Sequence, residues 1–245
     1  MQEVLPAWRR AYRIVNSSFP PLAVFEDTLS PDDLEIAFAL EAMTNDRLRE
    51  EAGSLQRVAP SDRVSGPGST AVMAAFTHIG NSSRFSDGSY GVYYCASSID
   101  TAIAETKFHQ ERFLAATRET NVEITVRAYV NKVVKPLVDV RDLPELHQPD
   151  PAAYGNSQAF AREHRDGKTW GLLYKSVRLA GHECAAAFRP RAVSLPVQGP
   201  HFRYVWDARA GVITHVMELT EVRSEGDHRA VLEPGQVRWR SHWLA

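Results

Sequence analysis

An alternation of apolar and polar residues at positions 122–130 constrains the fold more than any other feature of this sequence. The apolar positions are Val122, Ile124, Val126, Ala128 and Val130. Successive side chains of a strand point to opposite faces of a sheet, so a period of two predicts a strand with one covered face. Aromatic and β-branched composition predicts further strands at residues 90–96, 170–174, 184–188, 202–206 and 212–219.

Helix signals occur mainly in the first half of the chain. Ser30 can cap a helix that continues with Pro31 at the first helical position and two acidic residues, and this helix is predicted to run to about Glu51. Further helices are predicted from Ser98 or Asp100 to about residue 117, and at residues 156–165.

The segment between the first two helices, residues 56–91, is rich in Gly, Ser, Pro and Asp. We expect a loop around one short strand at residues 72–76. Helices and strands therefore do not alternate regularly, and this order favours an α+β fold over a doubly wound parallel sheet.

The composition excludes several classes of protein. The chain has 245 residues, 44% of them hydrophobic, and a formal net charge of −2, so it lacks the basic surplus typical of nucleic-acid binders. Its longest apolar runs are too short to cross a membrane, and its N-terminus lacks the hydrophobic stretch of a signal peptide. Cys95 and Cys184 lie far apart among apolar residues, which is typical of buried thiols. We therefore expect a cytoplasmic protein that binds neither nucleic acid nor membranes.

Two short motifs resemble cofactor-binding patterns, but the residues around each of them do not fit such a site. Residues 66–71 fit the dinucleotide-binding pattern G-x-G-x-x-A, but no strand precedes them and the next stretch has strand composition, so we expect a turn. His182-Glu183 begins like the zinc-protease motif H-E-x-x-H, but Ala186 stands at the position of the second His. We expect no metal site.

Residues 83–105 combine an Arg in a Gly/Ser-rich turn, an aromatic strand and an acid in a helix. Arg84 could donate two hydrogen bonds to a phosphate, Tyr94 could present its ring to a flat heterocycle, and Glu105 could support a positive charge or accept a proton. The spacing allows an equal alternative, in which Arg84 pairs with an acid, Tyr94 belongs to the core and Glu105 faces solvent.

The same stretch, R-F-S-D-G-S-Y-G-V-Y-Y-C-A, followed by the helix with Glu105, resembles the core of the RES-domain toxins. That family is named for an Arg, a Glu and a Ser, and its commoner form reads G-R-W-N before a Y-x-A strand. Residues 154–159 resemble its Ser/Thr-Gln helix, and residues 171–178 and 188–190 resemble its closing strands. The resemblance covers about residues 63–190, and Phe85-Ser86 replaces the common Trp-Asn.

The resemblance implies an ADP-ribosyltransferase-like fold of the α+β class, with a split, antiparallel sheet and flanking helices. Residues 1–62 would be an N-terminal, partly helical extension packed on the core, and residues 63–245 the RES domain. The resemblance also implies an enzyme that consumes NAD without a metal. Such an enzyme would be the toxin of a bacterial two-gene toxin–antitoxin module. The implied partner is a helix-turn-helix (Xre-like) antitoxin that blocks the active site.

We consider three functions for this chain, two of them implied by the resemblance. The preferred one is cleavage of the nicotinamide–ribose bond with transfer of ADP-ribose to a protein acceptor. In the second, water or phosphate is the acceptor and the enzyme depletes NAD. In the third, the pocket belongs to a non-catalytic nucleotide-binding module.

The implied roles can be assigned to residues of this sequence. Glu105 would stabilise the oxocarbenium-like transition state, Tyr94 would stack on the nicotinamide, and a Ser hydroxyl would hold the ribose or carboxamide. Arg84 and a second Arg would bind the pyrophosphate. Spacing selects Arg63 as that second Arg, whereas Tyr12-Arg13-Ile14 resembles the family's opening strand and would require an insertion of about fifty residues. The Ser is Ser157 or Ser176.

Overall fold

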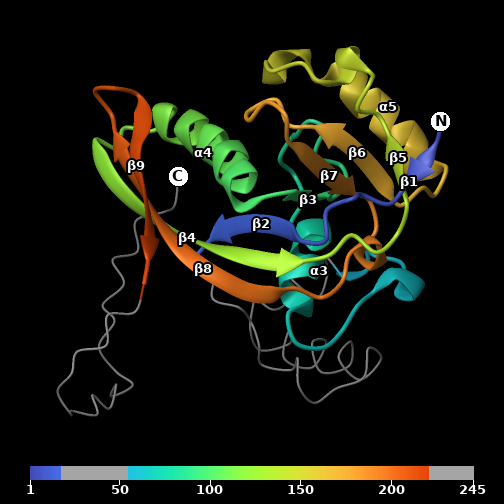
Figure 1. The fold of residues 1–245 in the computed structure, drawn as a ribbon. Helices are drawn as coiled ribbons and strands as arrows, with labels where there is room; N and C mark the ends of the chain where they lie inside the picture. The colour runs from blue at the N-terminus through green and yellow to red at the C-terminus, as the bar shows by residue number, and fades with distance from the viewer. Residues whose placement is uncertain (18–54, 221–245) are drawn as a thin grey trace, which may run out of the picture.

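The computed structural model describes residues 1–17 and 55–220. In that part of the chain, nine strands form one sheet and three α-helices pack against it (Figure 1). The helix expected at residues 30–51 lies outside the described residues.

The sheet has the spatial order β1-β5-β6-β7-β3-β2-β4-β8-β9, and all pairs are antiparallel except β5 with β6. The strands are β1 (Glu3–Val4), β2 (Ala11–Asn16), β3 (Tyr93–Ala96), β4 (Asn121–Asn131), β5 (Leu137–Asp139), β6 (Gly171–Lys175), β7 (Glu183–Ala187), β8 (Val197–Asp207) and β9 (Val212–Leu219). Six of the seven strands expected from the sequence are present, as β3, β4, β6, β7, β8 and β9.

Strand β2 lies inside the sheet, between β3 and β4. It pairs with β4 from Ala11 opposite Asn131 to Asn16 opposite Val126, and it meets β3 at Tyr12 opposite Ala96. The first residues of the chain therefore contribute an interior strand to the same sheet as the rest. The division of the chain between residues 62 and 63 stays a prediction.

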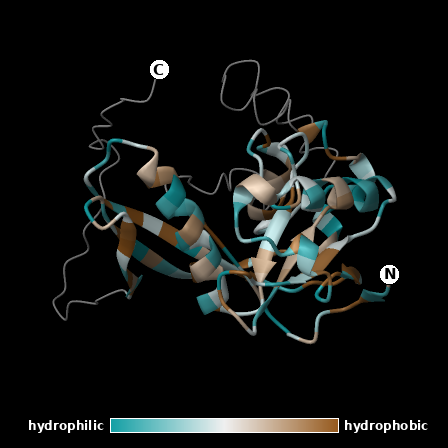
Figure 2. Cartoon of the chain, turned by 90° about the horizontal axis from the view of Figure 1, so that it is seen from above, coloured by the Kyte–Doolittle hydropathy of each residue, from teal (hydrophilic) through white to brown (hydrophobic). Residues whose placement is uncertain are grey.

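The helices cover both faces of the sheet. Helix α4 (Ile99–Ala115) and α5 (Gly155–Asp166) contribute Ala102, Leu114 and Ala161 to one hydrophobic core, whereas α3 (Ser69–Thr77) contributes to a second core. Figure 1 shows α4 and α5 above the sheet and α3 below it, and Figure 2 shows hydrophobic and hydrophilic segments alternating along the strands. The adjacent Tyr94 and Tyr93 accordingly belong to opposite cores. This arrangement confirms the α+β class and the mostly antiparallel sheet.

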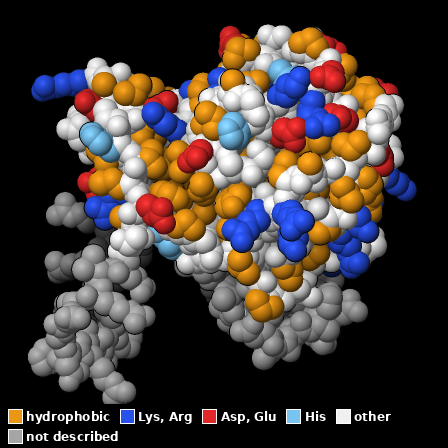
Figure 3. Space-filling view, viewed as in Figure 1, with side chains coloured by type: hydrophobic (Ala, Val, Ile, Leu, Met, Phe, Trp, Pro, Cys, Tyr) orange, Lys and Arg blue, Asp and Glu red, His pale blue; other side chains and the backbone are white. Residues whose placement is uncertain are grey.

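Helix α4 begins as the sequence predicts, because the Ser98 side chain accepts a 3.1 Å hydrogen bond from the Thr101 amide. Helix α5 also coincides with its expected range. No helix in the described ranges is long and apolar enough to cross a membrane. On the face shown in Figure 3, Lys and Arg side chains are interspersed with acidic and hydrophobic ones.

The strand expected at residues 72–76 is wrong, because these residues belong to helix α3. Val72, Met73 and Phe76 are buried on one side of the helix, a spacing that fits 3.6 residues per turn, and the alanines between them favour a helix. Gly91 lets this helix approach β3, since a Cβ there would lie 2.2 Å from the Ala75 carbonyl oxygen. An apolar run of five residues is too short to distinguish the helical period of 3.6 residues from the strand period of two.

The turn expected at residues 66–71 leads directly into this helix. Gly68 precedes α3 with a φ of 88°, and a Cβ there would lie 2.3 Å from the Pro196 carbonyl oxygen. Glycine at this position therefore allows the backbone before α3 to lie close to the backbone at Pro196.

Candidate functional site

Arg84 lies buried in the loop before β3, on the same face of the sheet as α4 and α5. Its guanidinium donates to the Leu146 and Gln148 carbonyl oxygens at 3.3 and 2.7 Å. It also donates to the Tyr154 hydroxyl at 3.2 Å and lies 4.6 Å from the centre of that ring. Among the described residues no carboxylate pairs with Arg84. A buried cation that is held only by dipoles and a ring is well suited to bind an anion.

Tyr94 fixes the loop that carries Arg84. Its hydroxyl accepts a hydrogen bond from the Phe85 amide at 3.0 Å and shares one with the Ser83 hydroxyl at 2.9 Å. Burial of this hydroxyl raises the pKa of Tyr94 above its ordinary value, although part of the residue's surface is accessible. Tyr94 therefore stays neutral and holds the loop at one end of β3.

Glu105 lies two turns into α4, where Ser176 faces it from the loop after β6. The Ser176 hydroxyl donates to Glu105 Oε1 at 2.6 Å and accepts the Arg178 and Leu179 amides at 3.2 and 3.1 Å. Cys184 Sγ lies 4.0 Å from the same carboxylate oxygen. Burial, followed by the Glu105 charge, raises the pKa of Cys184 well above its ordinary value, so it is a neutral thiol. The carboxylate is thus held in place by a neutral donor.

Several cationic side chains act on His109, which lies on the same helix as Glu105. His109 stands one turn after Glu105, and although its overall surface is exposed, burial of the ring and then the charges of Arg178, Arg112 and Arg84 lower its pKa to about 4. The Arg178 guanidinium stacks 3.3 Å from the centre of the Phe108 ring, and its Nε is buried without a hydrogen-bond partner in the described part. Burial first, and then these positive charges, therefore disfavour the protonated imidazole of His109.

Tyr174 on β6 connects these groups. Burial, followed by the ionisation of Cys184, Glu105 and Tyr94, raises its pKa well above the ordinary value, and the charge of Arg84 opposes this rise. The Phe85 ring contacts the Tyr174 ring edge-on at 5.0 Å. Arg84, Tyr94 and Glu105 thus all lie close enough to Tyr174 to act on its pKa.

The two candidate serines lie in different places. Ser176 is bonded to Glu105, whereas Ser157 on α5 is fully buried and donates to the Leu146 carbonyl oxygen at 3.2 Å. That carbonyl is one of those that hold Arg84. Ser157 and Arg84 therefore donate to the same carbonyl oxygen, whereas Ser176 lies beside the Glu105 carboxylate.

The two alternatives for the second Arg both lie away from Glu105. Arg63 is buried on the α3 side of the sheet, where its Nε donates to the Val58 carbonyl oxygen at 3.0 Å. Arg13 on β2 stacks 4.7 Å from the centre of the Tyr93 ring, also on that side, and donates to the Tyr94 carbonyl oxygen at 3.1 Å. Neither guanidinium is placed beside the carboxylate in this structure.

Sequence reasoning missed a row of side chains on α5 that hold the Arg84 loop. Gln158 Nε2 donates to Ser82 Oγ, the Ser83 carbonyl and the Ser86 carbonyl at 2.9, 2.9 and 3.2 Å. Arg162, one turn later, pairs with Asp87. With Tyr154 at the start of the helix, the spacing of four residues places all three on one face. That spacing of polar residues was the signal in the sequence.

No group of three or more His, Cys, Asp or Glu side chains in residues 1–17 and 55–220 has a geometry that could hold a metal ion. The side chains that converge at this site are one carboxylate, hydroxyls and cations. Such a set is suited to an anionic substrate on which positive charge develops during reaction.

A family model described as the RES domain matches residues 56–207, well over half of the chain. This chain belongs to the RES-domain family. The resemblance noted at residues 63–190 is thereby confirmed, and the matched region contains Arg84, Tyr94, Glu105 and Ser176.

Two further proteins are similar to this RES-domain chain. The uncharacterised protein y4oC of Sinorhizobium fredii is 29% identical over 198 residues, which cover 80% of this chain and 82% of that protein. A solved structure described as the M. tuberculosis MbcT–MbcA toxin–antitoxin complex aligns over 85% of this chain and 90% of the matched chain, with 12% identity and a TM-score of 0.37.

Proposed function

We propose that this RES-domain protein is the toxin of a toxin–antitoxin module that cleaves the nicotinamide–ribose bond of NAD and transfers ADP-ribose to a protein acceptor. The observation that carries the proposal is the Glu105 carboxylate, fixed by Ser176 at 2.6 Å and one helical turn before His109, whose pKa the charges of Arg178 and Arg84 help to lower. Family membership supports the toxin assignment, and the resemblance implies a helix-turn-helix antitoxin as partner in the cytoplasm.

The chemistry requires a carboxylate at the ribose. When the bond between the nicotinamide nitrogen and the ribose breaks, its electron pair leaves with neutral nicotinamide and positive charge develops on the ribose. Glu105 stabilises that charge in the transition state more than in the substrate, because the ribose is neutral beforehand. A nucleophile of the acceptor then bonds to the ribose carbon and loses a proton. Water or phosphate in that position would give free ADP-ribose or its phosphate ester.

The cations bind the diphosphate of the substrate. Arg84 and Arg178 lie on the same side of the sheet as Glu105, so we assign the pyrophosphate to them, whereas Arg63 supports the opposite side. The ring of Tyr94 is assigned to the nicotinamide, because it keeps partial exposure while its hydroxyl is held. Ser176 orients the carboxylate, and Ser157 positions Arg84 through the Leu146 carbonyl.

The test follows free nicotinamide and labelled protein together, after incubation with NAD that carries its label on the adenylate. Three chains are compared: the wild type, Glu105→Gln, and Glu163→Gln, a control that removes a carboxylate from the exposed surface of α5. A lysate supplies protein acceptors. We expect nicotinamide release and labelled protein with the wild type and the control, and loss of both by at least 100-fold with Glu105→Gln.

Each other result contradicts a defined part of the proposal. Nicotinamide release without labelled protein, even in lysate, replaces the transferase with a hydrolase or phosphorylase. Release at the wild-type rate by Glu105→Gln removes the role of Glu105. Binding of NAD by calorimetry without any release of nicotinamide identifies a nucleotide-binding module. Normal growth on expression of the active chain without its antitoxin removes the toxin assignment.

A further inference from the structure

His147 lies between the two carbonyl groups that hold Arg84. It directly follows the short 3₁₀ helix η2 (Pro144–Leu146). The carbonyl oxygens on either side of it, those of Leu146 and Gln148, accept from the Arg84 guanidinium at 3.3 and 2.7 Å. The backbone around His147 is therefore part of the support of Arg84, and its side chain is available for a different contact.

The hydrogen bonds of the His147 ring fix which nitrogen carries the proton. Nδ1 lies 2.7 Å from the Leu143 carbonyl oxygen, which can only accept, and the Lys175 amide, which can only donate, lies 3.0 Å from Nε2. The ring is therefore neutral, with its proton on Nδ1 and a lone pair on Nε2. Its centre lies 6.4 Å from that of the Tyr174 ring on β6. A doubly protonated ring would carry a proton on Nε2 and would lose the bond to Lys175.

This lone pair replaces a strand partner at the edge of β6. Strand β5 ends at Asp139, and the Val140 amide just beyond it donates to the Leu173 carbonyl oxygen at 3.0 Å. Backbone groups two residues apart point to the same edge of a strand, so the next donor on this edge is the Lys175 amide. The end of β6 is therefore held by the His147 side chain where β5 no longer accompanies it.

The end of β6 carries the serine of the proposed active site. Ser176 follows Lys175 directly, its amide donates to the His182 carbonyl oxygen at 2.9 Å, and its hydroxyl donates to Glu105 at 2.6 Å. His147 and His182 thus fix two successive amides of the chain at this point. A shift of the backbone here would move the Ser176 hydroxyl relative to the carboxylate.

The surroundings of His147 favour the neutral ring that this contact needs. Burial lowers the pKa of His147 below its ordinary value. Arg84 from the loop before β3 and Lys175 from β6 lower it as well, whereas the hydrogen bond to the carbonyl oxygen and the charge of Glu145 on η2 raise it. The form that can accept the Lys175 amide is therefore the one present at neutral pH.

We infer that His147 is a positioning residue, whose Nε2 holds the Ser176 hydroxyl against Glu105 through the Lys175 amide. The inference rests on the proposed function, because it assigns His147 to the step in which Glu105 stabilises charge on the ribose. His147 acts through Ser176 and not on the substrate. Since its neighbouring carbonyl groups hold Arg84, one residue joins the group assigned to the diphosphate and the carboxylate assigned to the ribose.

Two substitutions separate the two hydrogen bonds of the ring. His147→Asn places an amide nitrogen near the position of Nδ1 and leaves nothing at Nε2, so it keeps the bond to Leu143 and loses the bond to Lys175. His147→Gln is one carbon longer and can place its amide oxygen at the position of Nε2, so it keeps the bond to Lys175. His215→Asn changes an exposed imidazole on β9 and is the matched control.

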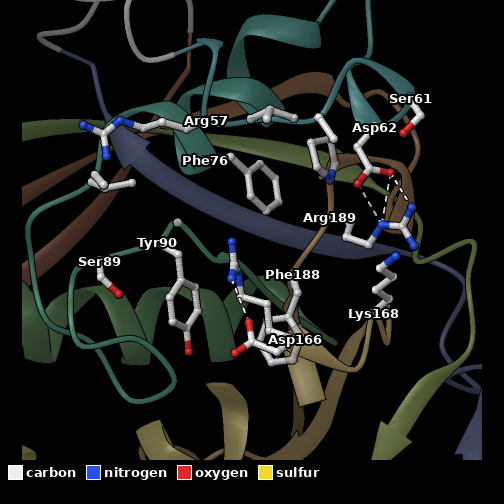
Figure 4. A pocket seen from close by; sticks show the side chains of 16 residues that line it. Arg57, Ser61, Asp62, Phe76, Ser89, Tyr90, Asp166, Lys168, Phe188 and Arg189 are labelled. Carbon is white, nitrogen blue, oxygen red and sulfur yellow. Dashed lines mark hydrogen bonds and ion pairs between the residues drawn. The ribbon is translucent and has the colours of Figure 1, made fainter. Parts of the chain in front are cut away.

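A second control separates positioning from stability. A cavity of about 550 Å³ between the ends of α3 and α5 is lined by none of His147, Lys175 or Ser176 (Figure 4). On its wall Arg189 makes a two-pronged ion pair with Asp62, at 2.8 and 2.6 Å, which Figure 4 marks with dashed lines. Asp62→Asn weakens this ion pair away from the proposed active site, so it should lower the unfolding temperature and leave kcat unchanged.

We expect His147→Asn to lower the kcat of nicotinamide release about tenfold and to change KM by less than about threefold, because the groups assigned to the diphosphate stay in place. The Lys175 and Ser176 amides should exchange their hydrogens with solvent about tenfold faster in this variant. His147→Gln should restore kcat to within about threefold of the wild type and keep the slow exchange. His215→Asn should match the wild type in every measurement.

The inference is overturned by wild-type kcat in His147→Asn, by an equal loss in His147→Asn and His147→Gln, or by a change confined to KM. A loss of kcat in Asp62→Asn as large as that in His147→Asn also overturns it, because both losses would then follow stability. If the wild type releases no nicotinamide, the proposed function fails separately. Hydrogen exchange then decides the role of His147: faster exchange at Lys175 and Ser176 in His147→Asn alone supports it, and unchanged exchange overturns it.

Discussion

The Ser176 hydroxyl donates a 2.6 Å hydrogen bond to Glu105, although the two residues are 71 positions apart and belong to different elements. The amides of Arg178 and Leu179 donate to the same hydroxyl oxygen, which directs its proton toward the carboxylate. The turn after β6 thereby orients a side chain on α4.

Replacement of Ser176 by Ala should lower the kcat of NAD cleavage about 10- to 100-fold, with a smaller change in KM. The reason is that the variant loses a hydrogen bond to the charged group that acts in the transition state, while the groups that bind the diphosphate are unchanged. Steady-state release of nicotinamide measures both constants. Ser176→Thr keeps the hydroxyl and should restore most of kcat. An unchanged kcat in Ser176→Ala would contradict the positioning role.

Much of the fold could be predicted from the sequence, because its strands carry their own pattern. Strand β4 alternates apolar and polar residues over its whole length, and Ser98 caps α4 with its own side chain. Helix α3 could not be distinguished from a strand, since its apolar run is too short. Nor could composition place β2 in the middle of the sheet, because its partners β3 and β4 follow it by about eighty and one hundred and ten positions.

Candidate site residues could be predicted where they lie within one continuous stretch of sequence. They could not be predicted where the site is formed by segments that are distant in the sequence. Arg84, Tyr94 and Glu105 lie within one continuous stretch, so one pattern located all three. The clustering of Arg178 with His109 depends on how the loop after β6 packs on α4, which no local pattern encodes. Arg63 was selected by its spacing from Arg84, but the sheet separates it from Glu105.

Gln158 should control the order of the Arg84 loop. Its side-chain amide donates to three oxygens of residues 82–86, and Gln158→Ala removes all three hydrogen bonds, which should lower the free energy of unfolding by about 1–3 kcal/mol. Gln158→Glu should be worse, because a carboxylate would face two carbonyl oxygens without a proton to donate. Hydrogen exchange of residues 82–89 measures the loosening.

Asn156→Ala, at an exposed position of the same helix, is the matched control for Gln158 and should leave this exchange unchanged. Equal exchange in Gln158→Glu and the wild type would show that α5 does not hold the loop. A loosened loop should also raise the KM for NAD, because Arg84 would no longer be preorganised.

Tyr154 should contribute to Arg84 through two separable contacts. Tyr154→Phe removes the 3.2 Å hydrogen bond and keeps the ring, whereas Tyr154→Leu removes the ring as well. We expect the free energy of unfolding to fall by about 1 kcal/mol in the first variant and by about 2 kcal/mol more in the second. Urea denaturation measures both values. A Phe variant as unstable as the Leu variant would show that the ring contact contributes nothing.

His109 should make the stability of the protein depend on pH. Its pKa in the folded chain is about 4, below the ordinary 6.5, so between these values the unfolded chain binds a proton that the folded chain does not. The contribution of His109 to stability is therefore fully present above about pH 6.5 and is lost as the pH falls toward 4. Urea denaturation across this window should give a shallower pH dependence in His109→Gln than in the wild type.

His215→Gln, which changes an exposed imidazole on β9, should keep the wild-type slope. Titration of the His109 ring by NMR gives a direct measurement, and a midpoint near 6.5 would contradict the lowered pKa. Addition of ADP-ribose should then move the midpoint upward, because a diphosphate bound between Arg84 and Arg178 would offset the charges that disfavour the imidazolium. A midpoint that does not move on saturation would place the diphosphate elsewhere, which makes His109 a reporter of the proposed substrate site.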